Sequence, residues 1–178
     1  MVDARAELNV FPIADDSAHP SALERELVDH FDQMRDPLMR YLLGFGLSPH
    51  DCEEIVQETF LALFQHLRLG KSRRNLRGWL FRVAHNLGLR KRQRTRVTEE
   101  LGDSVIDPAP NPEDQFATSE TQKRLLAVLH ALPEQDQQCL TLRAEGLRYR
   151  EIAEILDMSL GGVALALGRS LARIARAR

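Results

Sequence analysis

The sequence is poor in cysteine and has no long apolar run. Its two cysteines, Cys52 and Cys139, stand far apart and neither belongs to a CxxC pair, which argues against a disulfide framework or a zinc knuckle. No stretch approaches the roughly 18 consecutive apolar residues of a transmembrane helix. The first residues, MVDARAELNVFPIADD, carry acids where a signal peptide has a basic start. We therefore expect a cytoplasmic protein without membrane insertion.

Motifs of small-molecule catalysis are missing as well. Gly70-Lys71-Ser72 looks like the end of a phosphate-binding loop, but Gln65 stands where the first glycine of that motif belongs, and no strand precedes it. The histidines never form HExxH, and neither GxSxG nor GxGxxG occurs. The sequence thus predicts a protein that is not an enzyme and that needs no metal or cofactor.

The strict alternation of apolar and polar residues that marks a half-buried strand is also absent. Apolar residues recur instead at helical spacing through both halves of the chain. We therefore expect an all-α protein.

Whole segments lack charge of one sign. Residues 68–96 hold 11 Lys or Arg and no acid, whereas 98–120 hold seven acids and no base. Residues 1–67 hold 13 acids against four bases. Such blocks indicate separate surfaces for separate partners, for which a small-molecule enzyme has no evident need.

The basic stretch 68–96 is more than a solvated tail. Trp79, Leu80, Val83, Ala84 and Leu87 form one apolar stripe at helical spacing, so Trp79 is expected in the core, whereas Phe81 lies off the stripe. Asn75 is a plausible N-cap. The first turn then holds Arg77, where the helix dipole prefers an acid, and an arriving anion would offset the repulsion. This pattern favours a loop and helix that bind a polyanion, in the first place nucleic acid.

Capping signals predict the other helices of the first half. Ser21 and Glu24 form a capping box ahead of a stripe that Pro37 interrupts, which leaves two helices or one kinked helix open. Ser48 and Pro49 begin a helix over 49–68, whose core face leaves Glu53, Glu54, Gln57, Glu58 and Gln65 outside.

The second half predicts a helix-turn-helix. Helices are expected up to Pro133 and over 134–144, followed by a helix over 149–156, a turn at 157–159 and a last helix over 160–176. We expect four segments: a flexible arm (1–20), a helical domain (21–97), an acidic proline-containing linker (98–120) and the helix-turn-helix domain (121–178).

In this order and spacing the chain resembles the extracytoplasmic-function (ECF) group of bacterial sigma factors. The most specific pieces are DCEEIVQETFLALF at 51–64, RGWLFRVAHNLGL at 77–89 and LPEQDQQCLTLRAEGLRYREIAEILDMS at 132–159. The resemblance implies a transcription initiation factor that binds core RNA polymerase, directs it to promoters and helps to melt the −10 region. It also leaves room for an anti-sigma protein as a further partner.

The resemblance implies residues for each partner. The coiled coil of the largest polymerase subunit would contact Glu54, Gln57 and Glu58. The opened non-template strand of the −10 region would be held by the residues Lys71, Ser72, Arg73, Arg74, Asn75, Arg77, Arg82, His85, Asn86, Arg90 and Lys91. A strand with an extruded base needs such a basic groove with polar groups that reach base edges.

Duplex DNA at the −35 element would meet Arg148, Tyr149, Arg150, Ala164, Leu165, Arg169 and Arg173. Here the sequence departs from the family. Where long polar side chains usually reach bases, this helix presents a set of small or apolar residues: Gly161, Gly162, Ala164, Leu165 and Gly168. None can form a bidentate hydrogen bond to a base, so we expect weak, phosphate-driven duplex binding.

Two other classes stay open. A DNA-binding regulator could use the helix-turn-helix alone, although this leaves the first domain unexplained. A sigma-like protein-interaction module that does not support initiation would suit the small-residue face of the last helix.

Overall fold

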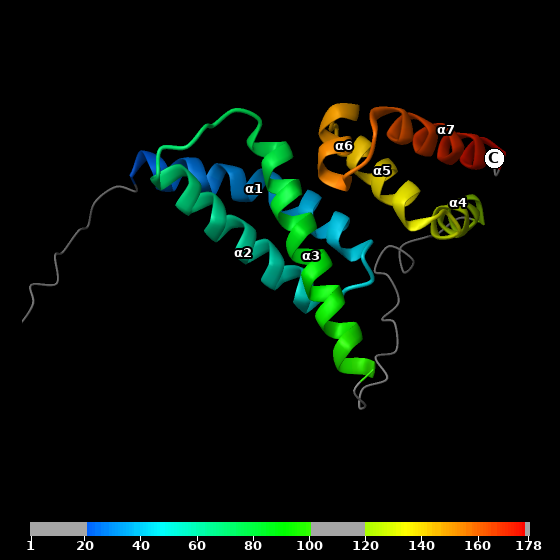
Figure 1. The fold of residues 1–178 in the computed structure, drawn as a ribbon, viewed down its shortest axis with the longest axis horizontal. Helices are drawn as coiled ribbons and strands as arrows, with labels where there is room; N and C mark the ends of the chain where they lie inside the picture. The colour runs from blue at the N-terminus through cyan, green and yellow to red at the C-terminus, as the bar shows by residue number, and fades with distance from the viewer. Residues whose placement is uncertain (1–20, 101–119, 177–178) are drawn as a thin grey trace, which may run out of the picture.

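The computed structural model describes residues 21–100 and 120–176, and these form seven helices and no strand (Figure 1). The expected all-α architecture is confirmed. The expected arm 1–20 and most of the expected linker lie outside the described residues. The helices are α1 (Ala22–Leu43), α2 (Pro49–Arg68), α3 (Leu76–Glu100), α4 (Glu120–His130), α5 (Glu134–Ala144), α6 (Tyr149–Leu156) and α7 (Leu160–Arg176).

Two helix ends differ from the sequence-based boundaries of the linker. The helix α3 continues to Glu100, beyond the expected boundary at 97, and α4 already begins at Glu120. Within this last part of α3, the hydroxyl of Thr98 donates to the carbonyl of Arg94 at 3.0 Å. The acidic composition from position 98 onward therefore does not mark the end of the helix.

The first helix is continuous although Pro37 lies inside it. The capping box predicted at its start is present, with the Ser21 hydroxyl accepting from the Glu24 amide and the Glu24 carboxylate from the Ser21 amide. A proline inside a helix costs about 3 kcal/mol. Buried side chains on both sides of it, Met34 and Leu38, bind α1 to the core and offset this cost.

The second helix has the predicted caps. The Ser48 hydroxyl accepts from the Asp51 amide at 3.1 Å, and Pro49 occupies the first helical position. One face of α2 is buried against α1 and α3, and it consists of Cys52, Ile55, Val56, Thr59, Phe60, Leu63 and Leu67. Its polar face is left to solvent, as expected.

An aromatic cluster joins α1 to α3. Tyr41 makes edge contacts with Phe45 and Phe81 at ring centroid distances of 5.4 and 5.6 Å. Phe81 is fully buried, so the residue that lay off the predicted stripe belongs to the core. Trp79 is half-buried and packs against His66, with ring centroids 4.6 Å apart. Neither ring is freely exposed for stacking on a base.

The C-terminal half is built around α5, α6 and α7. Asp157 takes the left-handed conformation, with φ of 51°, and turns the chain by 104° between α6 and α7. Ile152, Ile155 and Val163 are buried in this unit. The arrangement is the predicted helix-turn-helix.

The two halves touch, with α6 lying beside α3 and α5 beside α1 (Figure 1). Their buried apolar side chains form one continuous cluster. Both cysteines are buried in it, and burial raises the pKa of the Cys52 thiol to about 12 and that of Cys139 to about 11. They are packing residues of the core.

Within the described ranges, no single helix has the length and apolar character needed to cross a membrane. Among the helices that the structure describes, one pair, α6 and α7, has this length and apolar character when taken together, and the two are bent by 104° against each other.

Candidate polymerase and nucleic-acid interfaces

The outward face of α2 carries Glu54, Gln57 and Glu58, all of them exposed. We call these three residues the docking face. One of them is partly engaged within the chain, because Lys91 Nζ lies 3.0 Å from Glu54 Oε2 and 2.8 Å from Asp51 Oδ1. The docking face is therefore tied to α3 at one corner and open to solvent elsewhere.

Residues 71–75, which we call the basic loop, connect α2 to α3 and are all exposed. His66 Nε2 lies 2.8 Å from the carbonyl oxygen of Ser72 and fixes the start of the loop. Arg73 donates to the carboxylate of Glu26 at 3.0 and 3.2 Å. Lys71 and Arg74 extend from the same short segment, so the loop presents positive charge to solvent.

Asn75 ends the basic loop in an unusual conformation. Its φ is 55°, a left-handed value that asparagine tolerates better than most residues. Its side-chain oxygen accepts from the Gly78 amide at 3.2 Å, so it is the N-cap that the sequence predicted. A Cβ on Gly78 would lie 2.6 Å from the Asn75 Nδ2, which explains the glycine.

Three of the expected strand-binding residues, Arg82, Asn86 and Arg90, form a row on α3. They follow one another at steps of four, and all three are exposed. We call them the exposed row. A basic and amide-bearing row beside a basic loop is suited to bind a phosphate backbone and to reach the edges of unpaired bases.

His85 lies on a different face of α3 from this row. It is only 6% exposed and its Nδ1 forms a 2.8 Å hydrogen bond with the hydroxyl of Tyr41. Burial, with a smaller effect of Arg92, lowers the pKa of His85. Burial also raises the pKa of Tyr41 far above its ordinary value, so its hydroxyl stays protonated. The sequence analysis expected the His85 side chain to reach DNA. The structure places it in the core instead.

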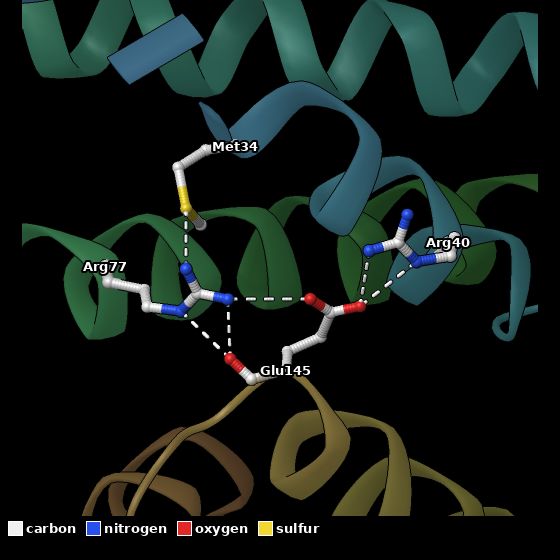
Figure 2. A network of polar contacts seen from close by, with 4 residues as sticks. All are labelled: Met34, Arg40, Arg77 and Glu145. Atoms are coloured by element: carbon white, nitrogen blue, oxygen red, sulfur yellow. Dashed lines mark hydrogen bonds and ion pairs between the residues drawn. The ribbon is translucent and has the colours of Figure 1, made fainter. Parts of the chain in front are cut away.

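Arg77 is also occupied within the chain. Its guanidinium donates to the carbonyl oxygen of Glu145, at 3.0 Å from Nε and 2.5 Å from Nη2 (Figure 2). The Glu145 carboxylate lies 3.5 Å from the same guanidinium, so in this structure an acid of the C-terminal half lies at the start of α3, where the sequence analysis expected an arriving anion.

The last helix exposes the small and apolar residues that the sequence indicated. Leu165 is 66% exposed, and Gly161, Ala164 and Gly168 share the outward side. Leu171 is 57% exposed, whereas Ser170 is buried. Ser170 takes the inward place because its hydroxyl is satisfied by the carbonyl of Ala166 at 2.8 Å.

Two of the arginines of α7, Arg169 and Arg173, have partners within the chain. Arg169 donates twice to Asp136, at 2.8 and 3.1 Å, and the Asp136 side chain is only 3% exposed. Arg173 reaches the carbonyl of Ala131 at 3.4 Å. Arg169 thus has its partner on α5, and Arg173 has its partner in the turn between α4 and α5.

The beginning of α6 is more open. Arg148, Tyr149 and Arg150 are exposed at its first turn, and the Arg143 guanidinium stands 5.7 Å from the Tyr149 ring centroid. The helix-turn-helix therefore begins with two exposed cations, Arg148 and Arg150. Among the residues that the structure describes, no group of His, Cys, Asp and Glu is arranged to hold a metal ion.

Five residues at the contact between the halves were missed by sequence analysis: Arg40, Arg92, Glu134, Glu145 and Glu154. Each reads as an ordinary exposed charge in its own helix. The sequence signal for this contact was Arg77. An arginine is unfavourable in the first turn of a helix, so its position there indicated a nearby anion.

Comparison with protein-family models matches both halves. The model "Sigma-70 region 2" matches residues 30–97, and the model "Sigma-70, region 4" matches residues 122–174. The basic loop, the exposed row and the docking face fall in the first match. The helix-turn-helix falls in the second.

Several curated proteins are similar in sequence. ECF sigma factor SigE of Mycolicibacterium smegmatis is 33% identical over 162 residues, which cover 86% of this chain and 60% of that protein. The sigma-E factor of Haemophilus influenzae is 30% identical over 136 residues, covering 68% of this chain and 71% of its own length. Sigma factor CnrH of Cupriavidus metallidurans is 30% identical over 143 residues, covering 74% and 75%. The chain thus spans less than two thirds of the mycobacterial protein.

Two solved structures share the fold. Sigma factor RpoE of Bartonella quintana, in complex with the anti-sigma factor NepR, gives a TM-score of 0.61 at 19% identity, covering 86% of this chain and 96% of that chain. CnrH in complex with the cytosolic domain of CnrY gives 0.59 at 21% identity, covering 85% and 86%.

Proposed function

The chain belongs to the extracytoplasmic-function group of bacterial sigma factors, and from this we propose that it binds core RNA polymerase, directs it to promoters and helps to open the −10 region. The observation that carries the proposal is the arrangement within the region 2 match. A basic loop and an exposed basic and amide-bearing row on α3 stand beside an acidic docking face on α2. Catalysis would belong to the polymerase, and the chain would work in the cytoplasm.

Each surface then has its own partner. The docking face, through Glu54, Gln57 and Glu58, binds the coiled coil of the largest polymerase subunit. The basic loop and the exposed row hold the opened non-template strand. Phosphate contacts from the arginines supply affinity, and Asn86 is placed to reach a base edge.

The division into units follows the same logic. Residues 21–97 act as the polymerase and −10 binding domain, and 121–178 as the duplex-binding domain, with 98–120 between them. His85 acts from the core, by positioning the helix that carries the exposed row, because its hydrogen bond to Tyr41 leaves it buried.

Duplex binding at the −35 element is expected to be weak. The outward side of α7 offers thymine methyl contacts from Ala164 and Leu165 but no side chain for bidentate readout. Arg169 and Arg173 would have to leave their present partners to reach DNA. Arg148, Tyr149 and Arg150 are better placed for phosphate contacts.

An anti-sigma protein is a further partner under this proposal. It is supported by the solved complex in which RpoE, a protein of the same fold, is bound to the anti-sigma factor NepR.

Run-off transcription with purified core polymerase tests the function. Core enzyme with the chain is expected to start transcripts at defined positions in a genomic fragment library, whereas core enzyme alone is not. Stable association without transcripts would favour the protein-interaction module, and duplex binding without association would favour the ordinary regulator. Either result would overturn the proposal.

A further inference from the structure

Acidic side chains of the C-terminal half hold arginines of the first half. Glu145 lies at the centre, where its carboxylate accepts from Arg40 at 2.8 and 3.1 Å and lies 3.5 Å from Arg77 (Figure 2). Arg77 also meets the sulfur of Met34 at 3.5 Å. The Glu145 side chain is only 12% exposed, so these contacts are sheltered from solvent on the acidic side.

Two further pairs extend this contact along α3. Arg92 is bound to Glu134 on α5, and Arg82 lies 3.9 Å from Glu154 on α6. The three arginines of α3 span roughly 22 Å, at 1.5 Å of rise per residue. We call the whole set the interdomain ion network, and its members are Arg40, Arg77, Arg82, Arg92, Glu134, Glu145 and Glu154.

Helix ends contribute to the same contact. Glu145 is the C-cap of α5, so its carbonyl lies at the negative end of that helix, where a cation is favoured. Arg77 lies in the first turn of α3, at the positive end, where an acid is favoured. The acid Glu145 therefore stabilises the positive end of α3, and the cation Arg77 stabilises the negative end of α5.

The interdomain ion network involves the side of α3 that is expected to bind DNA. Arg77 and Arg82 belong to the residues expected to bind the opened DNA strand, and Arg92 continues the same helix. Carboxylates beside arginines reproduce the charge and hydrogen-bond geometry that phosphates would offer. Acids of the C-terminal half therefore occupy positions that a DNA backbone would take.

We propose that the acids Glu134, Glu145 and Glu154 hold the free chain closed, and that single-stranded nucleic acid opens it by replacing them on α3. This rests on the proposed function, because it assumes that α3 binds the opened strand. The Arg82–Glu154 pair is exposed on both sides and is screened by salt, whereas the pairs of the sheltered Glu145 are screened less. Phosphates of a strand would compete for the same arginines. The closed population lowers the apparent affinity of the free chain for a strand.

The test is a full-length variant with Glu134→Gln, Glu145→Gln and Glu154→Gln. Its affinity for a fluorescein-labelled 20-nucleotide oligodeoxythymidine is compared with that of the unaltered chain at several salt concentrations. We expect the variant to bind about 3- to 30-fold more tightly at low salt, because removing the four ion pairs raises the open population. The advantage should shrink as salt screens the pairs of the unaltered chain.

A matched control separates the network from net charge. Asp29→Asn, Asp32→Asn and Asp157→Asn together remove the same number of negative charges, and none of these acids contacts an arginine of α3 in the described chain. Asparagine also tolerates the left-handed conformation at position 157. Equal gains in the control and the network variant would show that charge alone acts, and would overturn the proposal.

A second measurement follows the closure itself. Dyes on Gln33→Cys in α1 and Ala172→Cys in α7, both exposed sites, report the separation of the halves, since the native cysteines are buried. Energy transfer should fall when the oligonucleotide is added, and should already be low in the network variant. Unchanged transfer in both cases would refute the closed state. Run-off transcription tests the function separately, so the two failures remain distinguishable.

Discussion

The hydroxyl of Tyr41 lies 2.8 Å from Nδ1 of His85, and this hydrogen bond joins α1 to the buried side of α3. Phe45 packs edge-on against the same imidazole at 5.4 Å. Burial has the largest effect on the pKa of His85 and lowers it. Arg92 on α3 lowers this pKa further, whereas Glu134 on α5 raises it. The exposed row on the other side of α3 therefore depends on a neutral histidine in the core.

Protonation of His85 should destabilise the fold. Its folded pKa is lowered, so the unfolded chain binds the proton more readily, and stability is lost as pH falls below about 6.5, the ordinary histidine value. The loss from one such group is at most about 1.4 kcal/mol per pH unit. His85→Gln should show a flatter decline of the urea midpoint between pH 7.5 and 5. His50→Gln, at an exposed site, should follow the unaltered chain, and parallel curves for all three proteins would contradict the assignment.

Reversing the charge of the docking face should weaken polymerase binding. Glu54→Lys with Glu58→Lys removes two exposed acids, and surface changes usually alter stability by only about ±0.5 kcal/mol each. Lys91 keeps its pair with Asp51 in this variant. Affinity for core polymerase, measured by surface plasmon resonance, should fall. Glu53→Lys on the same helix is the control, and a folded double variant with undiminished affinity would refute the docking face.

Arg90→Ala should reduce binding of the opened strand whatever its sequence. A phosphate contact to single-stranded DNA contributes about 0.7 to the slope of affinity against salt, on logarithmic axes. The polymerase-bound variant should therefore show a slope smaller by about that amount on an oligonucleotide that carries the −10 region. Asn86→Ala is expected to change base preference at an unaltered slope. If Arg90→Ala leaves the slope intact, the residue does not hold a phosphate.

The basic loop should be needed for promoter opening. Alanine at positions 71–74 removes three cations and a hydroxyl but keeps Asn75, the cap of α3. Permanganate should then detect less unpaired thymine at a promoter that the holoenzyme still binds. Full opening with this variant would show that the loop is not the melting device.

Gly168→Ala should stabilise the chain. A Cβ at this position meets no atom within 4 Å, and alanine is preferred over glycine inside a helix by about 1 kcal/mol. Gly78→Ala should do the opposite, because the added atom would lie 2.6 Å from the Asn75 side chain. Urea unfolding of both variants checks the pair. A destabilising Gly168→Ala would mean that α7 is crowded at this point.

Sequence reasoning succeeded where the signal is local. Ser21 with Glu24, and Ser48 with Pro49, fixed two helix starts by hydrogen bonds over three residues, and the structure has both. The bounds of α5, α6 and α7 also agree with the expectation. Gly146 follows the end of α5 and the left-handed Asp157 ends α6, and each of these signals can be recognised from a single residue.

It failed where a residue depends on a distant partner. His85 is of a residue type that often contacts DNA. It is buried because Tyr41, on another helix, satisfies its ring nitrogen with a hydrogen bond. On α7, Ser170 rather than the neighbouring Leu171 is buried, because the serine can satisfy its hydroxyl on its own helix. Glu145 gave no signal, since its arginines come from α1 and α3.

The Asn75 cap sets the state of the basic loop before any strand arrives. With φ of 55° and its side chain folded over Gly78, this residue fixes the direction in which the loop leaves α3. His66 holds the other side of the loop through the Ser72 carbonyl. Conformational entropy that binding would otherwise remove from residues 72–75 is thus already lost during folding. The loop is preorganised, so that more of each phosphate contact can appear as affinity for the strand.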